Sequence, residues 1–315
     1  MKKLKGLLAL ILCAAVCIPL CGCDTIDRIF GNDRYGDGYY DDNYYNDPYA
    51  DNQYYNNVPQ LVSHYIDVGQ GDCEFIEFPD GQSMLIDAGP AESGKDVVNY
   101  IKNLGYNKID YVVATHPHTD HIGGMKQVIN SFTIGKIFMP KASSTTSTYK
   151  NLLEAIDKKG KKVTTTKAGT SIFRGNDSSL SVKVLAPVGN NYEELNDYSI
   201  VLKITYGKVR LLYMGDAEQI SENDILKKNY DVSADVIKVG HHGSSTSSGQ
   251  SFVNKVRPQF AIMSLGAGND YHHPHNQVVN RWIKAGAEII RTDECGDIVL
   301  TTDGDEFSID TEKGG

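Results

Sequence analysis

The chain has 315 residues and a formal net charge of −9 at pH 7. This length is ample for one large domain or a two-layered core, even after terminal targeting residues are removed. The acidic balance does not point to a nucleic-acid binder, but it does not describe the charge at a local site.

The N-terminus has the pattern of a secretory signal. Three lysines precede residues 6–20, which are almost wholly apolar but short for a membrane-spanning helix of about 20 residues. The segment ends Leu-Cys-Gly-Cys at residues 20–23, which resembles a bacterial lipobox. We predict a signal peptide over residues 1–22 and a lipid on Cys23 that tethers the protein outside the cell, on a bacterial membrane. An ordinary signal peptide or an uncleaved anchor is the alternative.

The next segment is rich in Asp, Asn, Tyr and Gly. Residues 31–57 contain no aliphatic side chain except Ala50. Such a stretch cannot bury enough apolar surface to offset the entropy lost on folding. We therefore predict a disordered linker over residues 23–57, with a Tyr-rich tract that binds cell-wall sugar as the alternative.

Residues 58–315 are predicted to form one α/β domain, because β-branched apolar runs and helical apolar spacing alternate along the chain. Strands are expected at residues 61–68, 73–78, 83–86, 109–114, 134–139, 180–185, 200–206, 209–214, 236–239, 260–264, 288–291 and 298–301. Helices are expected at residues 95–104, 125–129, 148–159, 220–228 and 278–285. The order suggests two sheets covered by helices. Pairing of Cys73 with Cys295 stays open.

The strongest chemical signal is Thr-His-Pro-His-Thr-Asp-His-Ile-Gly-Gly at residues 115–124. His116 and His118 are two residues apart, so in extended backbone they point to the same side and can hold one ion. Asp120 and His121 can turn the other way and hold a second. Imidazole and carboxylate groups are ligands for Zn, Mn or Fe.

Further ligand-type residues follow three other predicted strands. They are Asp216, the pair His241 and His242, and the pair His273 and His275. Loops at strand ends that meet at one edge of a sheet are where α/β folds build sites. We expect these loops to converge on the histidine cluster.

These stretches, in this order, resemble the metallo-β-lactamase superfamily, and more closely the metallo-β-lactamase-like domain of the DNA-uptake competence protein family ComEC. The resemblance covers about residues 60–303. It is carried by residues 66–72, 115–124, 214–218, 238–244 and 273–274. It implies a four-layered αββα sandwich and a site for two divalent metal ions.

The resemblance also implies roles for individual residues. His116 and His118 would hold the first ion, and Asp120 and His121 the second. Asp216 would bridge both ions. One of His241 and His242 would complete the second ion's shell, and Asp87 would be a buried acid that orients the metal loop.

The chain departs from the family at one place. Many members have a further histidine where this sequence has Asn-Asp-Tyr-Ser at residues 196–199. We hypothesise that Asn196 or Asp197 reaches the first ion or the substrate instead. An oxygen ligand favours harder ions, so Mn²⁺ becomes a rival to Zn²⁺.

The implied activity is metal-dependent phosphodiester hydrolysis outside the cytoplasm, acting on DNA for uptake or scavenging. Asp120 would orient or deprotonate the attacking hydroxide, and His273 would protonate the leaving oxygen, unless it is a structural loop residue. The alternatives are a cell-wall phosphorylcholine esterase, another metallo-hydrolase such as a β-lactamase, or a non-catalytic binding module with structural metals.

Other features are ambiguous or expected to lie outside the site. Residues 243–248 either bind a phosphate oxygen or form an ordinary Ser-rich loop. Lysines between residues 158 and 167 are expected to be solvated rather than to meet a phosphate backbone. No ligand role is expected for His64, His272 or His275.

Overall fold

The computed structural model describes residues 59–174 and 179–314. The predicted signal peptide, Cys23 and the linker over residues 23–57 lie outside this range. Among the described residues, no helix has the length and apolar character needed to cross a membrane. The predicted domain boundaries therefore stay predictions.

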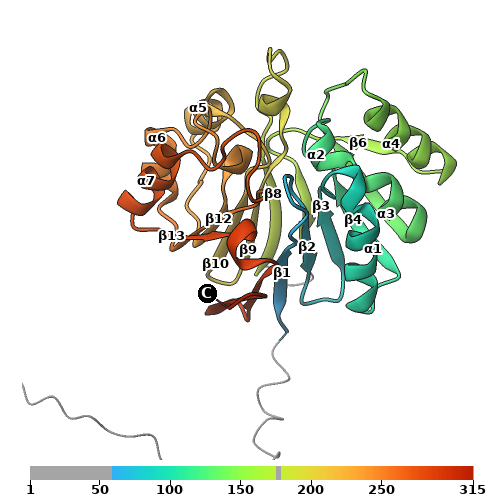
Figure 1. Ribbon diagram of the computed structural model, residues 1–315, viewed down its shortest axis with the longest axis horizontal. Helices are drawn as coiled ribbons and strands as arrows, with labels where there is room; N and C mark the ends of the chain where they lie inside the picture. Colours follow the sequence, from blue (N-terminus) through green and yellow to red (C-terminus); the bar gives the residue numbers. More distant parts are fainter. Residues whose placement is uncertain (1–58, 175–178, 315) are drawn as a thin grey trace, which may run out of the picture. The chain divides into compact units, whose positions relative to one another are not determined.

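Two sheets form the centre of the domain (Figure 1). The first has the order β15-β14-β1-β2-β3-β4-β5-β6, and the second has the order β13-β12-β11-β10-β9-β8-β7. The first comprises β1 (Leu61–Tyr65), β2 (Glu74–Glu77), β3 (Ser83–Ile86), β4 (Lys108–Val113), β5 (Thr133–Met139), β6 (Val163–Thr165), β14 (Ile298–Thr302) and β15 (Phe307–Thr311). The second comprises β7 (Ser171–Arg174), β8 (Leu180–Ala186), β9 (Val201–Tyr206), β10 (Val209–Tyr213), β11 (Val236–Lys238), β12 (Phe260–Met263) and β13 (Glu288–Arg291).

Helices cover the outer face of each sheet, which confirms the four-layered αββα sandwich (Figure 1). One side carries α1 (Gly94–Asn103), α3 (Met125–Ser131) and α4 (Ser147–Lys158). The other carries α5 (Gln219–Lys227), α6 (Gln250–Val256) and α7 (Asn276–Lys284). The one-turn helices α2 (Thr119–Ile122) and α8 (Thr292–Cys295) lie in loops.

Strand alternation explains why successive residues near the ends of β3 and β4 are apolar. Ile86 and Val113 face the core between the sheets, whereas Leu85 and Val112 face the core under the helices. Neighbouring side chains of a strand point to opposite faces, so a strand covered on both faces needs apolar residues at every position. This pattern made β3 and β4 predictable.

Some elements differ from the predictions. β6, β7 and β15 were not expected, because they are short or carry polar residues on one face, as edge strands do. The expected strand over residues 61–68 ends at Tyr65. Cys73 and Cys295 are both free thiols, so the disulfide alternative is not realised in this structure.

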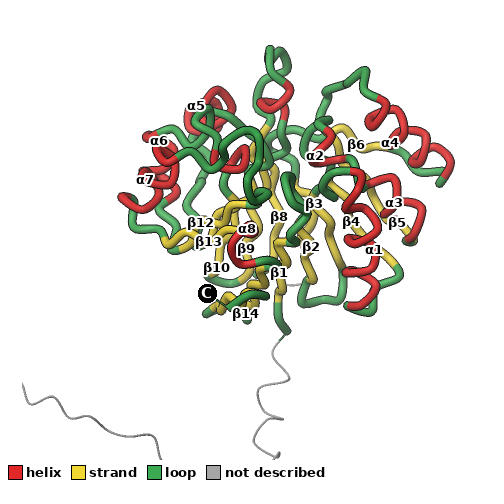
Figure 2. Tube along the Cα trace, in the orientation of Figure 1, coloured by secondary structure: helices red, strands yellow, loops and turns green. Residues whose placement is uncertain are grey.

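The site is positioned by parallel strands. β3, β4 and β5 run parallel in the first sheet, and β10, β11 and β12 run parallel in the second. Their carboxyl ends lie at the same end of the sandwich, where the loops of Figure 2 gather. The loops after β3, β4, β10, β11 and β12 carry Asp87, the histidine cluster, Asp216, His241–His242 and His273, as expected.

Candidate metal centre

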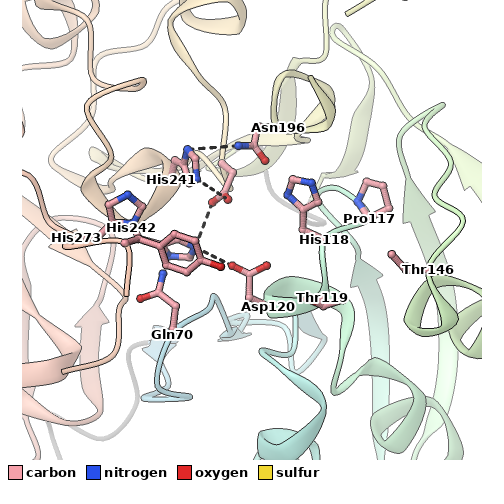
Figure 3. A pocket seen from close by; sticks show the side chains of 12 residues that line it. Gln70, Pro117, His118, Thr119, Asp120, Thr146, Asn196, His241, His242 and His273 are labelled. Atoms are coloured by element: carbon pink, nitrogen blue, oxygen red, sulfur yellow. Dashed lines mark hydrogen bonds and ion pairs between the residues drawn. The ribbon is translucent and has the colours of Figure 1, made fainter. Parts of the chain in front are cut away.

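Most of the ligand-type side chains predicted from the sequence line one cleft of about 330 Å³. His118 and Asp120 lie on one side of it, and His241, His242 and His273 lie on the other (Figure 3). These two sides come from the two halves of the sandwich. The cleft therefore has the open geometry of a catalytic site rather than a closed structural one.

A change in backbone conformation orders the histidine cluster. His118 is extended, with φ −80° and ψ 154°, and it is the N-cap of the one-turn helix α2. Asp120 and His121 lie inside that helix and so face a different side. A neighbouring turn supports the cluster from outside, because Asp72 donates its backbone N–H to the Asp120 carbonyl. Gly71 lies so close that a side chain there would collide with the same carbonyl oxygen.

Asp87 is the buried acid beneath the cluster. Its carboxylate accepts hydrogen bonds from the Thr115 backbone N–H at 2.8 Å and from the Thr115 hydroxyl at 2.5 Å. It also lies 2.8 Å from His121 Nδ1. Burial raises the pKa of Asp87, although the bonds from His121 and Thr115 oppose this shift. Holding Nδ1 in this way directs Nε2 of His121 into the centre.

One group of ligand atoms comes from Asp120, His121, Asp216 and His242, and all of them lie within 4.8 Å of one another. His121 Nε2 is 3.2 Å from Asp216 Oδ1, and His242 Nε2 is 3.6 Å from the same oxygen. His242 Nε2 is also 3.4 Å from Asp120 Oδ2. Ligand atoms bound tetrahedrally to zinc at about 2.0–2.1 Å lie about 3.3 Å apart, so these separations suit one ion.

A second group comes from His116, His118 and Asp216. His116 Nε2 is 3.0 Å from His118 Nδ1 and 3.7 Å from Asp216 Oδ2. Asp216 thus presents one oxygen to each group. This is the bridging position that the resemblance implied.

The residues fit a cation because several of their buried atoms have no other partner. Among the described residues, His121 Nε2, His242 Nε2 and Asp216 Oδ1 are buried and form no hydrogen bond. A buried polar atom without a partner costs about 1–3 kcal/mol. All three atoms belong to the group formed by Asp120, His121, Asp216 and His242, so one divalent ion would satisfy them together.

The charges of the cluster favour a cation at the same place. Burial alone would lower the pKa of His242, but Asp216 and Asp72 raise it to about 10. Burial alone would raise the pKa of Asp216, but His121, His242 and His241 hold it well below its usual range. The carboxylates therefore stay ionised, and their field draws in either protons or a metal ion.

Asp72 and Lys238 were missed as supporting residues. Asp72 Oδ1 lies 3.2 Å from His242 Nδ1, and its Oδ2 accepts a hydrogen bond from Lys238 Nζ at 2.7 Å. The Ser264 carbonyl is 2.8 Å from the same His242 nitrogen. Both residues lie within the stretches that carried the family resemblance, but their pairing across 166 positions could not be read from the sequence.

Asn196 and Asp197 have different surroundings. Asp197 Oδ1 accepts a hydrogen bond from the backbone N–H of Ser221 at the start of α5. Asn196 lines the cleft and donates from Nδ2 to Glu218 Oε1 at 3.0 Å. Glu218 was not singled out in the sequence, and it holds His241 Nδ1 at 3.0 Å.

His273 lines the cleft and is buried, and its Nδ1 forms no hydrogen bond with the described residues. Asn269 fixes its backbone, because the Asn269 side chain bonds both its N–H and its carbonyl. Burial and the nearby His242 and His241 lower the pKa of His273 to about 4. His273 is therefore neutral at pH 7, which does not favour a stored proton for the leaving group.

The remaining predicted bystanders lie outside the cleft. His64 is held between Tyr100 and Glu77, and His275 accepts a hydrogen bond from the Ser245 backbone N–H. His272 is exposed. The lysines between residues 158 and 167 do not line the cleft either.

Comparison with known proteins agrees with the fold and the cluster. Residues 66–164 match the Metallo-beta-lactamase superfamily. ComE operon protein 3 of Bacillus subtilis (strain 168) is 30% identical over 250 residues, which are 74% of this chain and 32% of that protein. Competence protein ComA of Neisseria gonorrhoeae is 27% identical over 232 residues, which are 73% of this chain and 30% of that protein. The chain thus spans about a third of the length of these curated relatives.

A solved structure shares the fold. A mutant of the CmlA beta-hydroxylase superposes with a TM-score of 0.51 at 15% identity, over 77% of this chain and 53% of that chain. Together with the two sheets and the ligand clusters, these matches show a domain similar to those of the metallo-β-lactamase superfamily. Within that superfamily, the domain resembles those of the competence proteins.

Proposed function

We propose that the protein is a metal-dependent phosphodiesterase that hydrolyses DNA outside the cytoplasm, tethered to the membrane through a lipid on Cys23. The observation that carries the proposal is the pair of ligand groups that share Asp216 in an open cleft. Relatives named for competence and recombination, processes that handle DNA, support the choice of substrate.

The centre suits two divalent ions, Zn²⁺ or Mn²⁺. When bound, they would supply positive charge for the phosphate oxygens and lower the pKa of an attacking water. Asp120 is placed to orient that water, because its side chain is 30% exposed while the other acid of the centre is buried. Burial alone would raise the pKa of Asp120, but His121 and His242 together hold it well below its usual range, so this carboxylate is available to accept a hydrogen bond.

The cleft also offers groups for the rest of the substrate. Tyr271 is 63% exposed, lines the cleft and stacks on His273 with 5.6 Å between ring centroids. An exposed aromatic ring beside a phosphodiesterase centre suits a nucleobase, because every base has a face that can stack. The same ring could pack against a quaternary ammonium group, so a phosphorylcholine ester is the second candidate substrate.

A substrate panel tests the proposal. Fully metallated protein is given single-stranded DNA, double-stranded DNA, a phosphorylcholine ester and a β-lactam, each beside a His118→Ala control. We expect cleavage of DNA that the control lacks. Turnover of the choline ester without DNA cleavage would favour the second candidate, and no turnover would favour a binding module.

A further inference from the structure

We propose that His241 is a ligand of the first ion, the ion of His116 and His118, and that Glu218 positions it there. The two adjacent histidines would then serve different ions, His241 the first and His242 the second. The inference rests on the proposed metal-dependent function. It replaces the hypothesis that Asn196 or Asp197 reaches the first ion.

The two oxygens of Asp216 separate the histidines. Oδ1 lies 3.6 Å from His242 Nε2, on the side of the second ion. Oδ2 lies 3.7 Å from His241 Nε2 and also 3.7 Å from His116 Nε2, on the side of the first ion. His241 therefore faces the same carboxylate oxygen as an expected ligand of the first ion, at the same distance.

The other nitrogen of His241 is held as those of His121 and His242 are. Glu218 Oε1 lies 3.0 Å from Nδ1 of His241. Carbonyl or carboxylate oxygens likewise lie beside Nδ1 of His242 and Nδ1 of His121. A ligating histidine usually donates its second nitrogen to such an oxygen, which fixes the tautomer and leaves the first nitrogen for the metal.

Glu218 is itself fixed in place. Its Oε1 accepts hydrogen bonds from Asn196 Nδ2 at 3.0 Å and from Thr246 Oγ1 at 2.9 Å. Asn196 therefore supports the carboxylate that holds His241. Its own Oδ1 is buried and has no hydrogen-bond partner in the described part of the chain, which makes Asn196 the rival ligand that an experiment must separate from His241.

The backbone places consecutive side chains on opposite oxygens of Asp216. His241 and His242 both have positive φ angles, 48° and 51°. This conformation is uncommon for residues other than glycine and is found mostly where function requires it. Two adjacent residues would point to opposite faces of an extended strand, whereas here the tight turn sends both imidazoles to one carboxylate.

The inference changes the expected metal preference. With His241, the first ion has three nitrogen ligands and one carboxylate oxygen. The histidine that the family supplies from the middle of the chain would be replaced by one from the loop after β11. Such a nitrogen-rich set favours Zn²⁺ over Mn²⁺, contrary to the preference that an oxygen ligand would give.

The first test measures zinc without substrate. Wild type, His241→Ala and His272→Ala are loaded with Zn²⁺, and metal per chain is counted by mass spectrometry and affinity by competition with a chromogenic chelator. His272→Ala is the matched control, because it removes an exposed imidazole at a similar φ of 58°. We expect two ions in wild type and in the control. We expect His241→Ala to keep one ion and to bind the other at least about 100-fold more weakly.

Two further variants test Glu218 as the residue that positions His241 and Asn196 as the rival ligand. Glu218→Gln is expected to weaken the first ion by about 10–100-fold, as loss of a supporting hydrogen bond does. It should also shift the visible spectrum of Co²⁺ at that site, which a merely structural role would not do. Asn196→Ala is expected to keep both ions and to weaken the first ion less than Glu218→Gln does, because Thr246 still bonds Glu218. The thermal stability of each metal-free variant shows whether it is folded.

Some results would overturn the inference. They are a folded His241→Ala protein that holds two ions at wild-type affinity, a wild type that never binds a second ion, or loss of the first ion in Asn196→Ala alone. Since no substrate is present, failure to cleave DNA would contradict the proposed function and leave this result standing.

Discussion

The residue that sets the geometry of the centre without facing the cleft is Asp87. It holds the Thr115 backbone and hydroxyl as well as His121 Nδ1. An amide in its place can accept fewer of these bonds and turns an N–H₂ group toward one of the donors.

Asp87→Asn is therefore expected to weaken binding of the second ion by about 10–100-fold. Zinc competition measures the change, and Asp80→Asn in the exposed turn between β2 and β3 is the control. Unchanged affinity in the Asp87 variant would show that the buried acid does not orient His121.

His273 gives a prediction about pH. Its pKa falls from the ordinary 6.5 to about 4 in the folded metal-free protein, through burial and neighbouring histidines. The unfolded chain therefore takes up this proton first as pH falls, so folding loses stability between about pH 6.5 and pH 4.

Removing the imidazole should reduce that loss. Urea unfolding of metal-free wild type and His273→Gln at pH 7 and pH 5 measures the difference. We expect wild type to lose more free energy of unfolding than the variant on acidification. Equal losses would mean that His273 titrates normally.

Tyr271 gives a prediction about substrate binding. If its exposed ring stacks on a base, Tyr271→Ala should lose about 1–3 kcal/mol of binding, which appears as a higher KM for single-stranded DNA. The rate on a small activated phosphodiester without a base should change little. A loss of kcat on both substrates would instead indicate that Tyr271 acts by holding the His273 ring in position.

Within single elements, α5 carries a buried acid that fixes the loop before α6. Glu222 accepts hydrogen bonds from the backbone N–H groups of Ser248 at 2.6 Å and Gly249 at 2.8 Å. Burial raises the pKa of Glu222 to about 7, although these two bonds oppose the shift. The Ser-rich loop beside the metal centre is thus tied to a helix.

Glu222→Ala should leave both N–H groups without their acceptor and cost about 2–3 kcal/mol of stability. Urea unfolding of the metal-free protein measures the cost. Glu154→Ala on the exposed side of α4 is the control and should change stability by less than about 0.5 kcal/mol. A Glu222 variant as stable as this control would show that Glu222 does not fix the loop before α6.

Element by element, the sequence predicted what local pattern determines. Most strands buried on both faces and most helices with one apolar face were placed correctly, as β4 and α1 illustrate, but the helix α6 was missed. The edge strands β6 and β15 were missed, because a short half-exposed strand has no pattern that separates it from a loop. The one-turn helix α2 follows from the loop's contacts rather than from helix propensity.

The candidate site was predictable to a similar degree. The dense histidine motif and the resemblance brought the right loops together, including that of Asp216. Which oxygen of Asp216 each of His241 and His242 faces could not be predicted, because it depends on a turn with two positive φ angles. The contacts of Glu218 and Lys238 also depend on tertiary structure, since their partners lie far away in the chain.

For the whole molecule, the metal centre lies between the two halves of the sandwich. His116, His118, Asp120 and His121 follow a strand of the first sheet, whereas Asp216, His241 and His242 follow strands of the second. Asp216 contacts both groups, so the relative position of the sheets decides whether both ions fit.

The most direct test of the central claim is cleavage of DNA by the metal-loaded protein. Single-stranded and double-stranded DNA are incubated with wild type and with His118→Ala, with Zn²⁺ or Mn²⁺ and then with excess chelator. We predict cleavage by wild type that chelation abolishes and that falls by at least about 1,000-fold in the variant, which corresponds to about 4 kcal/mol of transition-state stabilisation. Intact DNA after incubation with wild type shown to hold two ions per chain would contradict the account.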